Sequence, residues 1–152
     1  MASGHTHKIR CLGGSAGGYT MKKIEAFIRE EKLDDVKAAL RDIGIVGMSV
    51  LEVRGHGRQG GVTLAGRIGT YQVDMLTKLQ LNIVLSDHNV EKTIEAIRKA
   101  AAIGRPGDGI IFIYPVEDVV RIRTGERGQA AIMYEDDIDA REKLKSPGSK
   151  HD

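Results

Sequence analysis

Residues 21–44, MKKIEAFIREEKLDDVKAALRDIG, decide the fold of this chain. Over residues 22–28, aliphatic residues alternate with charged residues and a phenylalanine, which is typical of a β-strand with one more apolar face. A helix is expected next, and Gly44 is placed to end it in a left-handed conformation. The apolar residues of this helix have the spacing of a single helix face: Leu33, Val36, Leu40 and Ile43. The stretch therefore predicts a strand followed by an amphipathic helix.

The same pattern returns 57 residues later, where Ile24 corresponds to Leu81 and Leu40 to Ile97. A β-α-β order that occurs twice predicts an α+β, ferredoxin-like double βαβ fold, with an antiparallel sheet and both helices on one face. The other elements are expected as strands at 47–54, 72–85, 110–113 and 119–123, and a helix capped by Asp87 or Asn89 and closed by Gly104.

The second face of the predicted sheet is also expected to be apolar. Its candidate residues stand in runs without strict alternation: Leu79, Leu81, Val84 and residues 111–113. An uncovered apolar face has to meet a partner, and a homo-oligomer is the simplest cover.

The composition is that of one packed domain. Of 152 residues, 41% are hydrophobic and 29% charged, and the net charge of 23 − 21 = +2 is too small to indicate nucleic-acid binding. The single cysteine, Cys11, excludes an intramolecular disulfide. No apolar run approaches the roughly 18–20 residues of a membrane span. We therefore expect a cytoplasmic protein without a nucleic-acid partner.

The two ends of the chain differ from its middle. Residues 1–20 are rich in glycine, serine and threonine, and we expect a flexible leader or tag, with Met21 as the original start. Residues 133–152 are strongly charged and predict either a short helix or disorder. The folded domain is therefore expected over residues 21–132.

Glycine makes up 19 of 152 residues, against a usual share of about 7%. Six glycines lie between Gly55 and Gly69, in a stretch of about 18 residues with little core pattern. A loop of this length is uncommon in a compact domain unless it has a function. Two interpretations stay open: a loop that orders on a ligand or partner, and a plain hairpin extension.

Two further segments carry groups that suit an anion. Residues 103–112, IGRPGDGIIF, fit a backbone cradle for phosphate or an ordinary turn equally well. In residues 121–128, RIRTGERG, Arg121 and Arg123 alternate on the expected strand and would share one face. They suit bidentate bonds to phosphate, although pairing with acidic residues is slightly favoured on the pattern alone. No Ser-His-Asp, Cys-His or paired-carboxylate arrangement indicates an enzyme.

Four runs together resemble one family. They are MKKIEAFI from residue 21, GIVGMSVLEVRGHGRQGG from 44, the turn G-x-PGDG-x-IF from 104, and PVEDVVRIRTGERG from 115. In this order and spacing, residues 21–132 resemble PII signal-transduction proteins, also called nitrogen regulatory protein PII. The resemblance implies a homotrimer with nucleotides bound in clefts between subunits. It also implies a long T-loop, here Gly55 to Tyr71, that contacts partner proteins.

The resemblance also implies residue roles. The implied nucleotide-binding residues are Ser49, Gly57, Arg58, Gln59, Val84, Gly107, Asp108, Gly109, Arg121 and Arg123. Gln59 would also help to hold magnesium and, with Lys78, 2-oxoglutarate. Tyr71 matches the tyrosine that some members carry in uridylylated or adenylylated form.

Some positions depart from the family pattern. The family usually has a lysine at Ile110 and a threonine at Ile103, so one charge and one polar contact to the phosphates are missing. A charge-assisted contact is worth roughly 1.5–3 kcal/mol, so ATP binding is expected to be tenfold weaker or more. ADP and AMP are then expected to compete with ATP. Gly69 replaces the serine that some cyanobacterial members phosphorylate, which excludes that modification.

These observations favour a regulator without enzymatic activity that binds ATP or ADP, with AMP as a further candidate, and controls nitrogen metabolism. Its T-loop would dock on a transporter or a metabolic enzyme, and a membrane would be reached only through the transporter. Two alternatives stay open: a PII-like regulator of carbon or bicarbonate uptake, and an interaction module that has lost nucleotide sensing.

Overall fold

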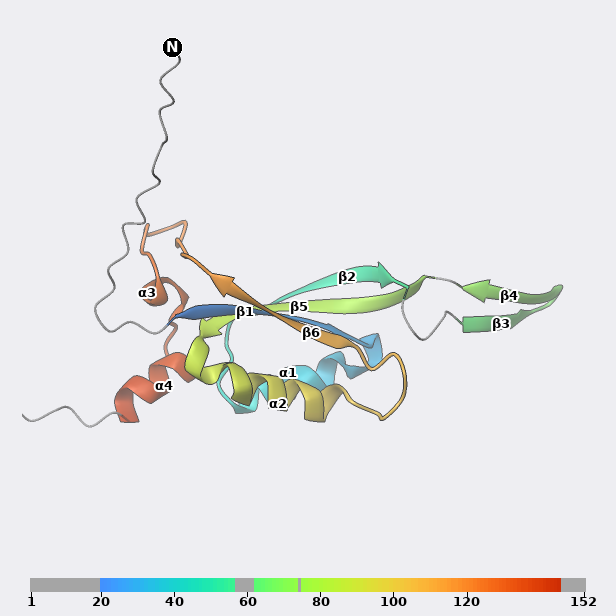
Figure 1. The fold of residues 1–152 in the computed structure, drawn as a ribbon, viewed down its shortest axis with the longest axis horizontal. Helices are drawn as coiled ribbons and strands as arrows, with labels where there is room; N and C mark the ends of the chain where they lie inside the picture. The colour runs from blue at the N-terminus through green and yellow to red at the C-terminus, as the bar shows by residue number, and fades with distance from the viewer. Residues whose placement is uncertain (1–19, 57–61, 74, 146–152) are drawn as a thin grey trace, which may run out of the picture.

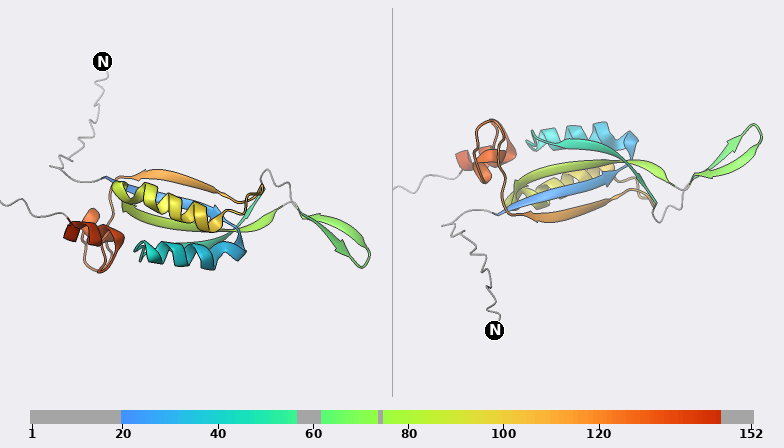
Figure 2. Two further views of the ribbon diagram at one scale, coloured as in Figure 1. Left: turned by 90° about the horizontal axis from the view of Figure 1, so that it is seen from below. Right: turned by 90° about the horizontal axis from the view of Figure 1, so that it is seen from above.

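The structure, a computed structural model, describes residues 20–56, 62–73 and 75–145. A four-stranded antiparallel sheet in the order β2-β5-β1-β6 carries two helices on one face (Figures 1 and 2). The elements of this core are β1 (Met21–Ile28), α1 (Leu33–Asp42), β2 (Ser49–Gly55), β5 (Leu76–Ser86), α2 (Val90–Ala101) and β6 (Ile110–Val116). In each βαβ unit, one strand of the other unit lies between the two strands: β5 lies between β1 and β2, and β1 lies between β5 and β6. The predicted α+β, ferredoxin-like fold is confirmed.

Smaller elements lie at the two ends of this core. A hairpin of β3 (Val62–Gly66) and β4 (Gly69–Val73) extends from one end of the sheet, and α3 (Gln129–Ile132) and α4 (Ile138–Lys145) lie at the other end (Figure 1). Short 3₁₀ turns, η1 (Glu30–Lys32) and η2 (Asp87–Asn89), precede the two long helices. Among the described residues, no helix is long and apolar enough to cross a membrane.

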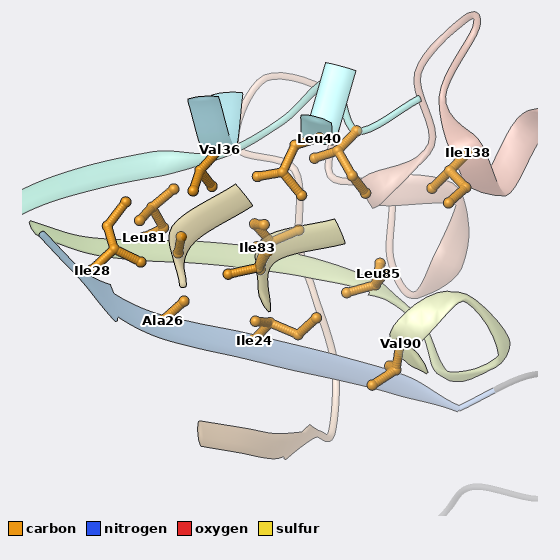
Figure 3. Packing of buried hydrophobic residues seen from close by; sticks show 13 residues of the cluster. Ile24, Ala26, Ile28, Val36, Leu40, Leu81, Ile83, Leu85, Val90 and Ile138 are labelled. Carbon is orange, nitrogen blue, oxygen red and sulfur yellow. The ribbon is translucent and has the colours of Figure 1, made fainter. Parts of the chain in front are cut away.

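The core forms because alternate residues of the central strands face the helices. Ile24 pairs with Ile83 and Ala26 with Leu81, and all four side chains are at most 2% exposed. Directly opposed residues of antiparallel strands point to the same side of the sheet. The helices close this layer with further apolar side chains: Val36 and Leu40 from α1 and Val90 from α2 (Figure 3). Ile97 of α2 belongs to the same cluster.

The ends of the two long helices agree only in part with those predicted from the sequence. Gly44 follows α1 with a φ of +93°, as predicted. The predicted cap of the second helix is right in position only: Asn89 occupies the N-cap of α2, but its side chain makes no capping bond. The buried Asn89 side chain instead donates to Asp139 at 2.6 Å, and Thr93 donates back to the Asn89 carbonyl at 2.9 Å.

The expected apolar residues of the second sheet face are partly wrong. Leu79, Leu81, Ile111 and Ile113 share the side of the buried Ala26 and Ile24 and face the helices. Consecutive apolar residues in β5 and β6 do not show which face each residue lies on, because both faces of these strands carry apolar residues. Val84 and Phe112 do lie on the face without helices, as expected, and Phe27, Leu51 and Tyr114 share that face. Phe27 and Phe112 meet there edge to face at 6.0 Å.

Two predicted strands differ from the structure. The predicted long strand of residues 72–85 is two strands, because β4 ends at Val73 and β5 begins at Leu76. The predicted strand at 119–123 is wrong, since this segment makes only an isolated bridge between Val120 and Arg127. Backbone bonds from Gly125 and Gly128 turn it into a tight loop. The fourth core strand, β6, extends instead to Val116.

The glycine-rich stretch after β2 contains a regular hairpin. Val62 pairs with Val73 and Gly66 with Gly69, so Arg67 and Ile68 form a two-residue turn at the tip. The Ile68 side chain is fully exposed. Residues 62–73 therefore form the hairpin that one of the two interpretations expects, with the exposed side chain of Ile68 at its tip.

The C-terminal segment packs on the core through Ile138. This side chain is 2% exposed and is directed toward the core cluster (Figure 3), while its amide donates to the Gly44 carbonyl at 2.7 Å. The carboxylate of Asp139, 4% exposed, accepts from the amide of Ser86 at 3.0 Å and from Asn89. Of the two expectations for this segment, the short helix is observed.

Gly109 is a position that only glycine fits. Its φ is +116°, and a Cβ atom there would clash with the carbonyl oxygen of Phe27. We therefore predict that Gly109→Ala lowers the free energy of unfolding by about 2–4 kcal/mol, measured by chemical denaturation. The matched control is Gly55→Ala, because nothing lies within 4 Å of a Cβ there. The control should leave stability unchanged or raise it by up to about 1 kcal/mol; equal losses in both variants would contradict the prediction.

Candidate functional site

A cleft lies at the edge of β5, where β2 no longer covers it. The pairing of β2 with β5 begins at Ser49 and Asn82, so residues 83–86 of β5 run on past the start of β2. The space there has a volume of about 430 Å³, between residues 45–49 and the loop at 119–121. Three of the predicted nucleotide-binding residues line it: Ser49, Val84 and Arg121. The structure therefore brings these three residues to one cleft.

Arg121 is held in the wall of this cleft by the chain's own groups. Its Nη2 donates to the carbonyls of Ala131 at 3.0 Å and Met133 at 3.1 Å. Its Nη1 lies 3.1 Å from Glu126 Oε2, and its guanidinium carbon lies 5.4 Å from the centre of the Tyr134 ring. A phosphate that reached this guanidinium would compete with the Glu126 carboxylate.

Arg123 does not share a strand face with Arg121. The predicted alternation fails because the backbone forms a tight loop here, with the Gly125 amide bonded to the Arg121 carbonyl at 2.8 Å. Arg123 is exposed, and Ile122 between the two arginines is fully exposed. The loop therefore presents an exposed cation beside the cleft rather than a rigid pair.

The second group of predicted residues forms the loop before β6. The Asp108 carboxylate accepts from the amides of Ile103 at 3.1 Å and Gly104 at 2.9 Å, so it closes its own loop. Lys78 Nζ donates to the Gly107 carbonyl at 2.7 Å, and Arg29 donates to Pro106 at 2.9 Å. Burial, reinforced by the charge of Arg29, lowers the pKa of Lys78. Two cations therefore fasten this loop to the sheet.

The two groups lie at opposite ends of the sheet. Val84 and Lys78 are six residues apart on β5, which corresponds to about 20 Å along a strand. Lys78 holds the loop before β6, and Arg121 lies in the loop after β6. The described part of one subunit therefore does not assemble the predicted nucleotide site from both groups.

Other predicted residues lie elsewhere. Gly57, Arg58 and Gln59, including the magnesium role of Gln59, fall outside the described residues. Tyr71 lies in β4, opposite Leu64 in the hairpin. Within residues 20–56, 62–73 and 75–145, no group of three or more histidine, cysteine or acidic residues could hold a metal ion.

Sequence reasoning missed Glu126, Tyr134 and the carboxylates of the C-terminal segment. Glu126 carried a signal, because an acidic residue in the same tight loop as Arg121 is a natural ion-pair partner. No sequence signal pointed to Tyr134, because the pattern of the surrounding stretch is one of charged residues. Its position depends on the docking of Ile138, a single apolar residue among charged ones.

The comparisons with known proteins agree on one family. The family model "Nitrogen regulatory protein P-II" matches residues 21–126. The protein of that name from Azospirillum brasilense is 55% identical over 112 residues, which cover 74% of this chain and all of the relative. Those from Pasteurella multocida and Rhizobium meliloti (strain 1021) are each 54% identical with the same coverage. The solved structure of B. subtilis GlnK is 29% identical with a TM-score of 0.61, covering 74% of this chain and 98% of that one.

Asp137 provides a test of how the C-terminal segment is packed. Burial raises the pKa of this carboxyl, and the charge of Asp139 acts in the same direction. A carboxyl group with a raised pKa in the folded state stabilises the fold when the pH is below the ordinary carboxyl pKa. This stabilisation is lost as the pH rises through the pKa of the folded state. We therefore predict that Asp137→Asn is more stable relative to wild type at pH 7 than at pH 3, measured by denaturation across that range.

The control for this measurement is Asp136→Asn. Asp136 is exposed and has a φ of +66°, which asparagine adopts readily. The difference between this variant and wild type should change less with pH. An Asp137→Asn difference that is the same at both pH values would contradict the prediction.

Proposed function

The chain belongs to the nitrogen regulatory protein P-II family, and from this membership we propose that it binds adenine nucleotides between the subunits of a homotrimer. Members of this family are signal-transduction regulators of nitrogen metabolism and not enzymes. We further propose that the bound nucleotide controls how the T-loop, which carries the β3–β4 hairpin, docks on a partner protein.

The separation of the two residue groups carries this proposal. The cleft with Ser49, Val84 and Arg121 lies at one end of the sheet, and the loop of Gly107, Asp108 and Gly109 at the other. A single nucleotide that contacts both groups therefore needs the cleft of one subunit and the loop of its neighbour. Because the two groups would have to come from neighbouring subunits, we expect this chain to bind the nucleotide only as an oligomer.

The face of the sheet without helices supports association. Leu51 is 46% exposed, Phe112 42% and Tyr114 43%, and all three lie on this face. Aromatic and aliphatic side chains gathered on one uncovered face favour contact with further copies of the chain. A ring of three subunits would cover these faces and bring clefts and loops of different subunits together.

The chemistry of the cleft suits a nucleotide. Its walls combine apolar side chains such as Met48 and Val84 with the Ser49 hydroxyl and the open edge of β5, whose backbone groups suit the polar edge of a base. Arg121 supplies positive charge for a phosphate, and the glycines of the neighbouring subunit's loop would allow close backbone approach. We propose adenine nucleotides, ATP or ADP with AMP as a further ligand, for this reason.

Binding of 2-oxoglutarate with magnesium, through Gln59 and Lys78, is a secondary proposal. The Nζ of Lys78 donates to the Gly107 carbonyl, so a 2-oxoglutarate carboxylate would share this ammonium group with the carbonyl. The partner of the T-loop is proposed to be a transporter or a metabolic enzyme, with Tyr71 as a candidate for covalent modification. A regulator of bicarbonate uptake would use the same site of this chain and is distinguished by which partner the purified protein binds.

The test is calorimetric titration of ATP, ADP and AMP, with the oligomer measured by sedimentation. We expect a trimer that binds ATP or ADP, and Arg121→Ala should weaken binding about tenfold or more. Arg127→Ala is the matched control, because Arg127 pairs with Asp118 at 2.6 Å in the same loop and does not line the cleft. A trimer without saturable binding at millimolar nucleotide would favour the interaction module that has lost nucleotide sensing.

Ile110 gives a second, gain-of-function prediction. It begins β6 directly after the glycine loop, is 54% exposed, and stands where the family usually has a lysine. Ile110→Lys should therefore strengthen ATP binding about tenfold, since it adds a charge-assisted contact to phosphate. Ile113→Lys, at a residue 47% exposed on the same strand but facing the helices, is the control and should have no such effect. Equal affinity of wild type and Ile110→Lys would show that this position does not reach the phosphates.

A further inference from the structure

Tyr134 is fixed in place by the segment that follows it. The amide of Asp137 donates to the Tyr134 carbonyl at 3.2 Å, which forms a turn. Beyond the turn, Ile138 is buried in the core and Asp139 is bonded to the buried Asn89. Tyr134 therefore begins a tight turn, and a buried anchor directly follows that turn.

The Tyr134 ring lies in the candidate nucleotide cleft. It lines the same space as Ser49 and Arg121, and a Cβ atom at Gly47 would lie 3.4 Å from its Cε2. The ring centre is 5.4 Å from the guanidinium carbon of Arg121, and the tyrosine is 49% exposed. An aromatic face at this distance attracts a guanidinium electrostatically.

The contacts of the Arg121 guanidinium with two carbonyls and with the Tyr134 ring fix the position of its charge in the cleft. Two carbonyls accept from its Nη2, and the Tyr134 ring contacts the guanidinium group, so the side chain has lost rotamer freedom before any ligand arrives. A group that is already ordered loses less entropy when it binds phosphate, and its affinity is therefore higher. Glu126 acts in the opposite sense, because its carboxylate competes for Nη1.

We propose that Tyr134 is a positioning residue for phosphate-bearing ligands: through its cation–π contact with Arg121 it holds the guanidinium in the cleft wall and favours nucleotides over nucleosides. This inference rests on the proposed nucleotide binding. It concerns the chain's own C-terminal segment, since the family model ends at residue 126, before Tyr134. The ligand class is a nucleotide, in which a ribose joins the phosphate to a planar base.

The test compares ATP with adenosine, which has the base and ribose but no phosphate. Tyr134→Ala should weaken ATP binding about two- to fivefold, the range of a partly exposed cation–π contact, and leave adenosine binding unchanged. Tyr134→Phe keeps the ring and should bind both ligands as wild type does. Glu126→Gln, which removes the competing carboxylate, should strengthen ATP binding and not adenosine binding. Thermal unfolding of each variant without ligand shows that the fold is kept.

The outcomes separate this inference from the proposed function. Equal weakening of ATP and adenosine in Tyr134→Ala would make the ring only a wall of the cleft and overturn the inference. Wild-type ATP binding by Tyr134→Ala would also overturn it, while nucleotide binding itself would stand. If wild type binds neither ATP nor ADP, the proposed function fails and the inference fails with it.

Discussion

The alternation of side chains along β1 and β5 is the constraint on which the rest of the structure depends. It directs Ile24 and Ala26, with their partners Ile83 and Leu81, to the helices, and their sequence neighbours to the opposite face. A shift of one residue in this register would exchange the two faces. The helical layer is therefore complete within one subunit, whereas the other face keeps aromatic side chains that no described element covers. Folding thus uses one side of these strands, and the proposed association would use the other.

The length of β5 links this sheet to the candidate site. This strand runs past the start of β2, which opens the cleft near Val84, and at its other end Lys78 holds the loop of Gly107. Rigid strands keep these two ends about 20 Å apart. A ligand that contacts both ends must therefore bridge two subunits, and any change in how subunits meet would change the site. This geometry offers a physical route from nucleotide to quaternary structure and so to the hairpin, which leaves the sheet next to Lys78.

The sequence was sufficient for the fold and insufficient for parts of the site. The alternation around Ile24 and the helical spacing around Leu40 are local patterns, and both predicted their elements. The segment at Arg121 was predicted as a strand because its residues alternate, but bonds from Gly125 and Gly128, which depend on a chain reversal, turn it into a loop. The docking of Ile138 depends on one apolar residue meeting a core built far away in sequence. The resemblance to a family supplied residues for one ligand and implied clefts between subunits, yet it did not say which of these residues lie at which end of the sheet.

The most direct test of the account is to mix two defective variants. Arg121→Ala damages the cleft. Arg105→Glu places a negative charge on the exposed loop before β6, where it would repel the phosphates that this loop is proposed to approach. Each variant alone should bind ATP weakly in calorimetric titration. Subunits that are unfolded together, refolded and mixed in equal amounts should regain high-affinity sites, about one quarter of the total for random assembly, where an intact cleft meets an intact loop. A mixture that binds no better than the two separate variants would contradict a site shared between subunits.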